Sequence, residues 1–318
     1  MIHASPVEKS MLGSGTKQSR PRLVWSPAYT FDWGLHVFPV QKYRMVAEEL
    51  KKEGVAGADD FETPVPATRT ELATVHTPAY LERLEALTGT EDGGVSEFEV
   101  PCTRLVLDTF KLATGGTILA ARRALECGSA ANLSGGFHHA FADRGEGFCL
   151  LNDLAVAIRV LQGEGRLRRA AVIDVDLHQG NGTARIFQDD PDVFTFSIHQ
   201  EHNYPIKERS RLDIGLRDGA RDDEYLDRLR EAVPRILDGH RPELVVYQGG
   251  ADPFERDRLG GLKLTKPGLR RRDELVFGEA RKRGIPVVVT LGGGYAEEIE
   301  DVVDIHVATV RALGEALR

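Results

Sequence analysis

Short apolar runs rich in β-branched residues alternate along this chain with longer segments whose apolar positions recur at helical spacing. Runs that are apolar on both faces are typical of strands buried inside a parallel sheet. The regular change from strand to helix therefore predicts an α/β fold with a doubly wound parallel sheet. The predicted strands are Arg22–Trp25, Ala131–Leu133, Ala170–Val175, Val193–Ile198, Leu244–Tyr247 and Pro286–Leu291. The predicted helices are Phe38–Glu53, Thr109–Cys127, Leu151–Leu161, Asp222–Leu237, Lys266–Lys282 and Ala296–Leu317.

The chain shows no internal repeat and no linker long enough to divide it, so one domain is predicted over residues 21–318. A chain of 318 residues buries a substantial core without disulfides or other staples. Residues 1–20, which are rich in Ser, Gly, Lys and Gln, are predicted to form a loose leader. The segments 54–68 and 88–101 are rich in Gly, Asp, Glu and Pro, and they are predicted to be surface loops.

The formal net charge of -8 argues against nucleic acid as a direct partner, because phosphate binding requires a basic surface. A basic cluster at the predicted helix 266–282 is interpreted as a solvated helix face; it contains Arg270, Arg271, Arg272, Arg281, Lys282 and Arg283. No run approaches the ~18 apolar residues of a membrane span, so no membrane partner is expected. The three cysteines form no Cys-x-x-Cys motif, which favours free thiols and a cytoplasmic location.

The residues that follow the predicted strands carry the candidate chemistry, because ligands of open α/β sheets bind beyond the carboxyl ends of the strands. Asp174, Asp176 and His178 leave one strand at alternating positions and therefore share a face. Together with Asp252, at another strand end, they suit an open site that binds Zn²⁺ or Fe²⁺ and activates water. A single aspartate at a strand end is most often a helix cap. Two aspartates and a histidine, however, are costly to bury without a cation.

Two further motifs at the same predicted edge allow a functional or a structural interpretation. His138 and His139 follow a glycine turn, where a neutral imidazole can take a proton from water, although a buried histidine is more often structural. Tyr295 follows a three-glycine loop and is either an oxyanion donor or a core tyrosine. A nucleophilic role for Cys149 is less favoured than a role as a small buried hydrophobe. The chain lacks a Gly-x-Ser-x-Gly motif, which disfavours a serine hydrolase.

In their order and spacing, these motifs resemble those of the zinc-dependent histone deacetylase family. The resembling segments are Gly135-Gly-Phe-His-His-Ala140, Gly147-Phe-Cys149, Asp174-Val-Asp-Leu-His178, Gly250-Ala-Asp252, Asp257-Arg-Leu-Gly260 and Gly292-Gly-Gly-Tyr295. The resemblance begins near Val24 and covers nearly the whole chain. It implies an arginase/deacetylase-like fold, in which an eight-stranded parallel sheet is flanked by helices and residues 21–318 form the catalytic domain.

The resemblance also implies a role for each matching residue. Asp176, His178 and Asp252 would bind one Zn²⁺ per chain. The implied catalytic group consists of a proton-transferring histidine pair, the residue behind each histidine and a tyrosine that polarises the acyl carbonyl: His138, His139, Asp174, Asn181 and Tyr295.

Structural K⁺ or Na⁺ ions and an acyl channel are implied in the same way. The first monovalent cation would contact Asp174, Asp176, His178 and Ser197, and the second would use backbone carbonyls near Phe187, Asp190 and Val193. The channel would be lined by Gly147, Phe148, Tyr204 and Leu259, with Gly147 accepting the amide hydrogen of the substrate. Arg44 would lie behind the site, near the exit for the released acid.

One position departs from the common pattern of the family. His178 is followed by Gln-Gly-Asn181-Gly where the common pattern has His-Gly-Asp-Gly, so an amide stands behind His139. This form, together with Asp143-Arg-Gly ahead of Gly147, resembles the class IV branch. An amide stabilises an imidazolium less than a carboxylate does. His138 is therefore predicted to be the more basic histidine.

The activity that the resemblance implies is the removal of acetyl or longer acyl groups from lysine side chains by metal-activated water. Acetylated polyamines, or other small acylated amines, are alternative substrates. An arginase-type ureohydrolase would need a second metal with further acidic ligands shortly after Asp252, and the following Pro-Phe-Glu-Arg residues do not supply them convincingly. A non-catalytic binding module is disfavoured because every catalytic position is filled. The sequence predicts no oligomeric state.

Overall fold

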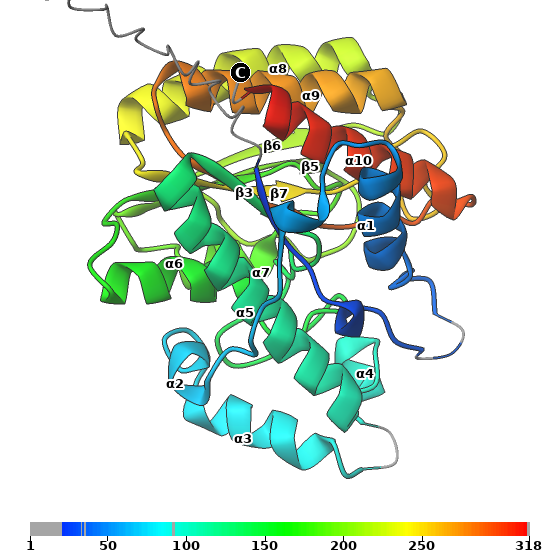
Figure 1. Cartoon of the computed structure of the whole chain (residues 1–318), viewed down its shortest axis with the longest axis vertical. Coiled ribbons are helices and arrows are strands. Elements are labelled where there is room, and N and C mark those ends of the chain that lie inside the picture. The colour runs from blue at the N-terminus through cyan, green and yellow to red at the C-terminus, as the bar shows by residue number, and fades with distance from the viewer. Residues whose placement is uncertain (1–20, 33, 35, 91–92, 317–318) are drawn as a thin grey trace, which may run out of the picture.

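A computed structural model describes residues 21–32, 34, 36–90 and 93–316, and one eight-stranded sheet forms its centre (Figure 1). Every pair of neighbouring strands runs parallel, in the order β2-β1-β3-β8-β7-β4-β5-β6. The strands are β1 (Arg22–Val24), β2 (Phe61–Glu62), β3 (Ser129–Asn132), β4 (Ala170–Asp174), β5 (Val193–Gln200), β6 (Leu212–Leu216), β7 (Leu244–Gly249) and β8 (Val287–Leu291). The expected α/β fold with an eight-stranded parallel sheet is confirmed.

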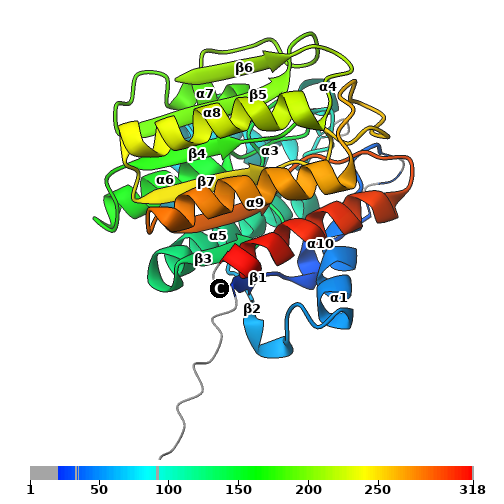
Figure 2. The same ribbon diagram turned by 90° about the horizontal axis from the view of Figure 1, so that it is seen from above.

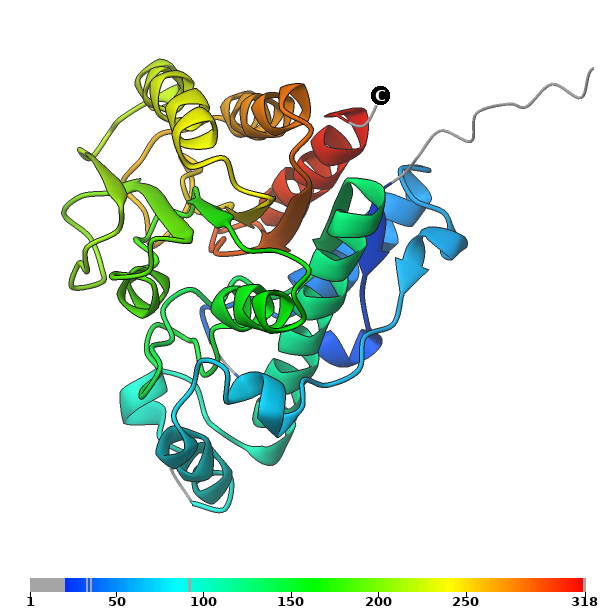
Figure 3. The ribbon, with the colours of Figure 1, turned by 90° about the vertical axis from the view of Figure 1, so that its left-hand side faces the viewer.

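Helices cover both faces of the sheet. One layer consists of α8 (Asp222–His240), α9 (Lys266–Lys282), α10 (Ile299–Ala316) and α1 (Lys42–Lys52), which packs against α10. The other layer consists of α5 (Arg104–Cys127), α6 (Asp153–Gly163) and α7 (Asn181–Ile186). Figure 2 shows α8, α9 and α10 stacked across the sheet, and Figure 3 shows the sheet between that layer and the layer of α5 and α6. The short helices α2 (Arg69–Leu72), α3 (Pro78–Leu87) and α4 (Val95–Phe98) extend the molecule beyond α5 (Figure 1).

The longest helix, α5, shows how local sequence sets the helix limits. The Thr103 hydroxyl accepts a hydrogen bond from the Val106 amide at 3.2 Å, which satisfies a free donor of the first turn. The helix ends at Gly128, whose φ of 92° lies in the left-handed region that glycine adopts without strain. Within the helix, a Cβ on Gly116 would lie 2.0 Å from the Tyr29 hydroxyl oxygen. Glycine is therefore required there for the helix to approach the residues that follow β1.

All six predicted strands and all six predicted helices are present, and most differ from the prediction by a few residues at their ends. The prediction missed β2 and β6, which are a two-residue strand and an edge strand that contains a glycine, and neither shows a long apolar run. It also missed four short helices, α2, α3, α4 and α7.

The prediction that 54–68 and 88–101 are plain surface loops is wrong in part. The first segment contains β2, and the second contains α4, whose last residue Phe98 is fully buried, as is Val100 after it. A few buried apolar side chains hold these segments against the rest of the protein, and the largely polar composition of the segments does not predict this. The predicted leader, residues 1–20, lies outside the described residues.

The sheet order places the candidate chemistry at one location. The strands β3, β8, β7, β4 and β5 are consecutive neighbours, although the chain visits them in a different order. Because all of them are parallel, their carboxyl ends meet at one edge, and the loops that carry the candidate residues start there. Among the described residues, no helix is both long and apolar enough to cross a bilayer.

Candidate active site

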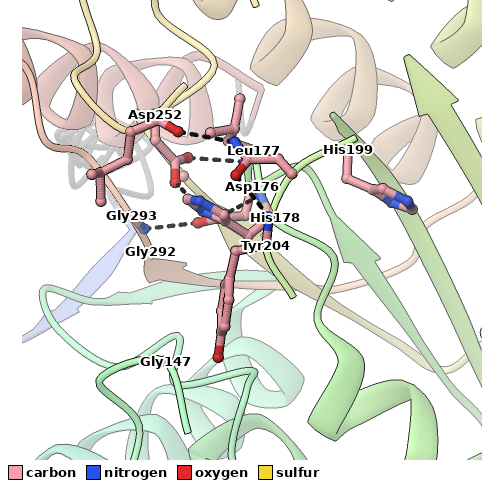
Figure 4. Close-up of polar contacts among 12 residues, drawn as sticks. Gly147, Asp176, Leu177, His178, His199, Tyr204, Asp252, Gly292 and Gly293 are labelled. Carbon is pink, nitrogen blue, oxygen red and sulfur yellow. Dashed lines mark hydrogen bonds and ion pairs between the residues drawn. The ribbon is translucent and has the colours of Figure 1, made fainter. Parts of the chain in front are cut away.

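Three buried side chains, Asp176, His178 and Asp252, meet beyond the ends of β4 and β7 (Figure 4). The His178 Nδ1 atom lies 3.3 Å from Asp176 Oδ1 and 3.1 Å from Asp252 Oδ2. One ligand atom from each residue lies within 4.8 Å of the others, and all three residues are buried. The structure thus brings together the three ligands that the sequence predicted on two separate strand ends.

The backbone around these carboxylates leaves them no space to move apart. A Cβ on Gly250 would lie 2.4 Å from Asp176 Oδ2, and one on Gly293 would lie 2.1 Å from Asp252 Oδ2. Backbone amides also donate hydrogen bonds to the two carboxylates. Gly293 N donates to Asp176 Oδ2 at 2.8 Å, and Leu177 N donates to Asp252 Oδ1 at 3.0 Å. A preorganised Asp₂His set with fixed outer hydrogen bonds fits a divalent cation of the zinc type.

The charges of the three side chains support the same conclusion. Burial, followed by the charge of the neighbouring Asp176, raises the pKa of Asp252 to about 7. Burial disfavours the His178 imidazolium, but hydrogen bonds to Asp176 and Asp252 outweigh this and raise its pKa to about 10. In the absence of a cation the cluster therefore retains a proton that two carboxylates attract. A divalent cation would displace that proton and neutralise the same carboxylates.

The histidine pair lies next to this cluster, and each ring has a different partner. His138 Nδ1 contacts Asp174 Oδ2 at 2.7 Å, and His139 Nδ1 contacts Asn181 Oδ1 at 2.9 Å. Asp153 holds the loop that carries the pair, because its carboxylate accepts hydrogen bonds from two loop amides, that of Phe137 at 2.8 Å among them. The pair is therefore held by the fold, as a functional pair requires.

The two histidines differ in basicity in the predicted direction. Burial lowers the pKa of His138, but the charges of Asp174 and Asp176 outweigh burial and raise it to about 9. Burial, followed by the charges of His138 and His178, lowers the pKa of His139 well below its ordinary value. His139 is accordingly neutral and His138 cationic over the neutral pH range.

Glu146, which the sequence interpretation did not single out, decides how Asn181 is oriented. Asn181 Nδ2 donates to Glu146 Oε1 at 2.6 Å, so the amide oxygen is the atom that faces His139. An oxygen acceptor requires the proton of His139 on Nδ1, which leaves the lone pair on Nε2. Asn181 thus selects the tautomer of His139 without adding a negative charge.

Tyr295 lies across the same cavity, held by Asp257. Asp257 Oδ2 accepts a hydrogen bond from Tyr295 N at 2.7 Å, and Asp257 Oδ1 accepts one from Leu259 N at 2.9 Å. Burial, and then the negative charge of Asp252, raises the pKa of Tyr295 well above its ordinary value. The hydroxyl therefore stays protonated and can donate a hydrogen bond.

A cavity of about 440 Å³ leads from the surface to this group, and it contains the predicted channel residues apart from Arg44. Its lining includes the following residues: His139, Gly147, Phe148, His178, Tyr204, Leu259 and Tyr295. Gly147 has a φ of 55°, and a Cβ there would lie 2.7 Å from both the His139 ring and the Tyr204 hydroxyl. Figure 4 shows Tyr204 extending toward Gly147, away from the metal-ligand cluster. A side chain at position 147 would therefore narrow the channel.

The expectation that Arg44 lies behind the site is wrong. Arg44 is exposed on α1, where it forms an ion pair with Glu48 at 3.0 Å. The buried cation on this helix is Lys42, whose Nζ donates to the Gly292 carbonyl and lies 4.7 Å from the centre of the Phe38 ring. Lys42 and Arg44 are two positions apart on the helix, so their side chains point to different sides. Which of the two side chains is buried therefore depends on how α1 is rotated about its axis.

The predicted monovalent-cation residues lie in two groups, and both cation sites stay predictions. Asp174 on β4 is paired in register with Ser197 on β5, and Ser197 Oγ contacts His199 Nδ1 at 2.9 Å. In the second group, the Phe187 carbonyl accepts from Asp190 N at 3.0 Å, and the Asp190 carbonyl accepts from Arg211 at 3.0 Å. Val193 begins β5 directly after this turn.

Cys149 does not have the properties of a nucleophile. It is buried, and burial raises the pKa of its thiol well above the ordinary value, so the thiolate is suppressed. The described cysteines are all free thiols. The structure agrees with the interpretation of Cys149 as a small buried hydrophobe.

Comparison with known proteins places this site in a family. The family model of the histone deacetylase domain matches residues 36–310. The chain belongs to the histone deacetylase family. An uncharacterized protein of Picosynechococcus is 44% identical over 278 residues, which are 87% of this chain and 92% of that protein. Histone deacetylase 2 of Arabidopsis thaliana is 35% identical over 298 residues, with coverage of 90% and 77%.

The fold agrees with solved structures of the same family. The crystal structure of a histone deacetylase homolog in complex with SAHA superposes with a TM-score of 0.80 at 25% identity, covering 93% of this chain and 84% of that one. The metal cluster, the histidine pair and Tyr295 all lie within the matched range of the deacetylase domain.

We expect Asn181→Asp to move the acidic limb of the kcat/KM profile to higher pH. A carboxylate behind His139 would raise its pKa by about 1–3 units, so the neutral form would require a higher pH. The measurement is the pH dependence of kcat/KM in both proteins. Glu146→Gln serves as the control, because a glutamine oxygen can still accept from Asn181 and should leave the limb in place. An unchanged acidic limb in Asn181→Asp would contradict the proposal that the amide behind His139 makes it the less basic histidine.

Lys42 gives a second expectation, for the metal-free protein. Burial lowers its pKa from 10.5 to about 8, and nearby carboxylates offset only part of this change. Between these two pH values the unfolded chain binds more protons than the folded one, so the folded state gains stability as pH rises. The stability of the wild type relative to Lys42→Met, measured by urea unfolding, should therefore increase from about pH 8 to about pH 10.5. Arg44→Met should show no such rise, and equal behaviour of both variants would refute the assignment.

Proposed function

We propose that the protein is a zinc-dependent deacylase that hydrolyses acyl-lysine amide bonds. The observation that carries the proposal is the convergence of three groups at one cavity: the Asp₂His cluster, the adjacent histidines His138 and His139, and Tyr295. A cavity of about 440 Å³, in which a side chain at position 147 would collide with His139 and Tyr204, suits an extended acyl-amine chain. The Gln-Gly-Asn form after His178 supports placing the chain in the class IV-like branch.

The proposed chemistry assigns one role to each side chain. A divalent cation bound by the cluster would act as a Lewis acid toward the acyl carbonyl and the attacking water. His139, with the lone pair on Nε2, accepts the proton of the water as it attacks. The Tyr295 hydroxyl donates a hydrogen bond to the carbonyl oxygen as negative charge develops on it. His138, held by Asp174, supplies a proton to the departing amine.

A ureohydrolase of the arginase type finds no support in the cluster. Among the described residues, the group with metal-ligand geometry is Asp176, His178 and Asp252. Glu255, the next acidic residue after Asp252, is exposed and outside that group. Metal analysis of the purified protein should therefore give one zinc per chain, and two manganese ions per chain would favour the ureohydrolase.

We expect Tyr295→Phe and His139→Ala to lose about 10²–10⁴-fold in kcat with zinc still bound, because the first removes a hydrogen-bond donor, the second removes a proton acceptor, and neither removes a metal ligand. Turnover of an acyl-lysine peptide and zinc content would be measured on the same samples. Cys149→Ala, directly after the cavity-lining Phe148, is the matched control, and it should keep most of the activity. Wild-type turnover in either Tyr295→Phe or His139→Ala would refute the assigned roles.

Acetylated polyamines are a second candidate substrate class, favoured by one carboxylate in the cavity lining and another that contacts a lining residue. Glu99 lines the cavity, is exposed and has a φ of 61°, and Glu146 contacts the Tyr204 hydroxyl at 3.3 Å. Negative charge at these positions favours a substrate that carries a further ammonium group.

A substrate panel separates the two classes. Acetyl-lysine peptide, myristoyl-lysine peptide and acetylated polyamine would be compared by kcat/KM with the zinc-loaded protein. For a polyamine enzyme, Glu99→Gln should raise KM for the polyamine several-fold with little change in kcat, because the contact is remote from the reacting bond. For a lysine deacylase, Glu99→Gln should leave the peptide substrates nearly unchanged, and the polyamine should be the poorest substrate of the three.

A further inference from the structure

One arginine of the basic cluster on α9 is fully buried. Arg270, Arg271 and Arg281 are partly or fully exposed, as predicted for a solvated helix face, but the interpretation is wrong for Arg272, whose side chain is inaccessible. Arg272 and the adjacent Asp273 belong to the face of α9 that packs on the sheet. They form a buried ion pair, with Arg272 Nε 2.9 Å from Asp273 Oδ1.

Neighbouring elements hold Asp273 in place. The Tyr247 hydroxyl on β7 donates to Asp273 Oδ1, and the Thr309 hydroxyl on α10 donates to Asp273 Oδ2 at 2.6 Å. A buried ion pair contributes little net stability, because removing both charges from water costs about as much as their attraction returns. An apolar pair of similar size could therefore fill the same space. The reason for a guanidinium at this position lies in its other contacts.

The other contacts of Arg272 are backbone carbonyls at the ends of the two metal-ligand strands. Its Nη1 donates to the Gly250 carbonyl at 2.8 Å and to the Val175 carbonyl at 3.3 Å. The Tyr225 hydroxyl on α8 donates to the same Val175 carbonyl at 3.2 Å. The Val175 carbonyl belongs to the peptide bond that leads into Asp176, and Gly250 stands two residues before Asp252.

These carbonyls lie where the regular sheet ends. The β4–β7 register extends to Asp174 and Gln248, and the last bond between the two segments runs from Val175 N to the Gln248 carbonyl at 3.1 Å. Beyond this hydrogen bond, the segments that follow β4 and β7 separate and form the loops that carry Asp176 and Asp252. Their buried carbonyls then need other donors, and one guanidinium nitrogen bridges both of them.

We propose that Arg272 is a positioning residue for the metal centre, fixing the relative placement of the loops that carry Asp176 and Asp252. The proposal rests on the metal site of the proposed function. The planar guanidinium donates to both carbonyls while its Nε stays paired with Asp273. A lysine ammonium could keep the charge pair but could not hold the same three-way geometry.

The test compares Arg272→Lys with a control on the same helix face. Val276→Ala removes buried packing from α9 without touching either carbonyl, and it therefore reports general destabilisation. Zinc affinity would be measured by competition with a chromogenic chelator, and the metal geometry by the visible absorption of the Co²⁺-loaded protein. We expect Arg272→Lys to weaken zinc binding by about 10-fold or more and to change the Co²⁺ spectrum. Val276→Ala should bind zinc within about twofold of the wild type at a comparable loss of Tm.

Hydrogen exchange of the metal-free protein gives a readout that does not depend on zinc. In Arg272→Lys, peptides covering residues 175–178 and 250–252 should exchange faster, because their amides depend on the spacing of the two loops. The Leu177 amide, for example, donates across to Asp252 Oδ1. Peptides from β5 should be unchanged. Unchanged zinc affinity and unchanged exchange at both loops would overturn the proposal, as would an equal loss of affinity in Val276→Ala.

Tyr225→Phe keeps the proposal testable where Arg272→Lys fails to fold. It removes one donor from the Val175 carbonyl and leaves Arg272 in place, so it should weaken zinc binding by several-fold; wild-type affinity and exchange would overturn the proposal. Failure of the proposed function is distinguishable. A wild-type protein that binds zinc but hydrolyses no acyl amide refutes the function alone. A wild-type protein that binds no zinc leaves the hydrogen exchange of the metal-free variants as the test of Arg272.

Discussion

Asp176 and Asp252 place two carboxylates side by side in the interior, against the ring of His178, and like charges at that depth repel unless a positive group or a proton neutralises them. Much of the surrounding structure serves to keep them together. Backbone amides of Gly293 and Leu177 saturate the outer carboxylate oxygens, and glycines stand wherever a side chain would collide with them. The fold thereby favours the binding of a cation between these carboxylates and fixes the direction from which the cation is bound.

The rest of the site is arranged by residues that do not reach the cavity. Asp153 holds the histidine loop through its amides, and Asp257 holds the backbone of Tyr295. Both are carboxylates that accept hydrogen bonds from main-chain N–H groups, which makes them rigid supports. Catalytic side chains on loops need such supports, because a loop alone has too few contacts to fix a side chain. Arg272 supports the strand ends in a similar way, but its guanidinium donates hydrogen bonds to main-chain carbonyls, whereas the two aspartates accept them from main-chain amides.

The chain also shows how one amide changes the electrostatics of a family site. Asn181 selects the tautomer of His139 through its oxygen, and Glu146 fixes the orientation of the amide from the other side. The carboxylate of Glu146 lies on the far side of Asn181 from the ring, and it also accepts a hydrogen bond from the Tyr204 hydroxyl. The two histidines thereby keep different partners and different basicities.

The sequence alone determined the α/β class, six of the strands and the six longest predicted helices, and it indicated that Asp176, His178 and Asp252 would meet at one edge of the sheet. These features are encoded locally: apolar runs mark the strands, and polar residues directly after them must lie at the carboxyl edge of a parallel sheet. Short elements were missed, since β2 and β6 are held by pairing to their neighbours and carry no long apolar run of their own.

Only the tertiary structure decided which charged residues are internal. Lys42 and Arg44 are two positions apart on one helix, and Arg270, Arg271 and Arg272 are adjacent, yet one member of each group is buried. Composition does not distinguish these neighbouring basic residues. Which of them is buried depends on how the helix is rotated against the elements that it packs on. The spacing from Leu269 to Val276 does place Arg272 on the buried stripe of α9, but basic residues are expected outside, and that expectation outweighed the periodicity. Burial of a charge requires partners from distant segments, here a glycine carbonyl for Lys42 and an aspartate with two strand-end carbonyls for Arg272, and such partners exist only once the chain has folded.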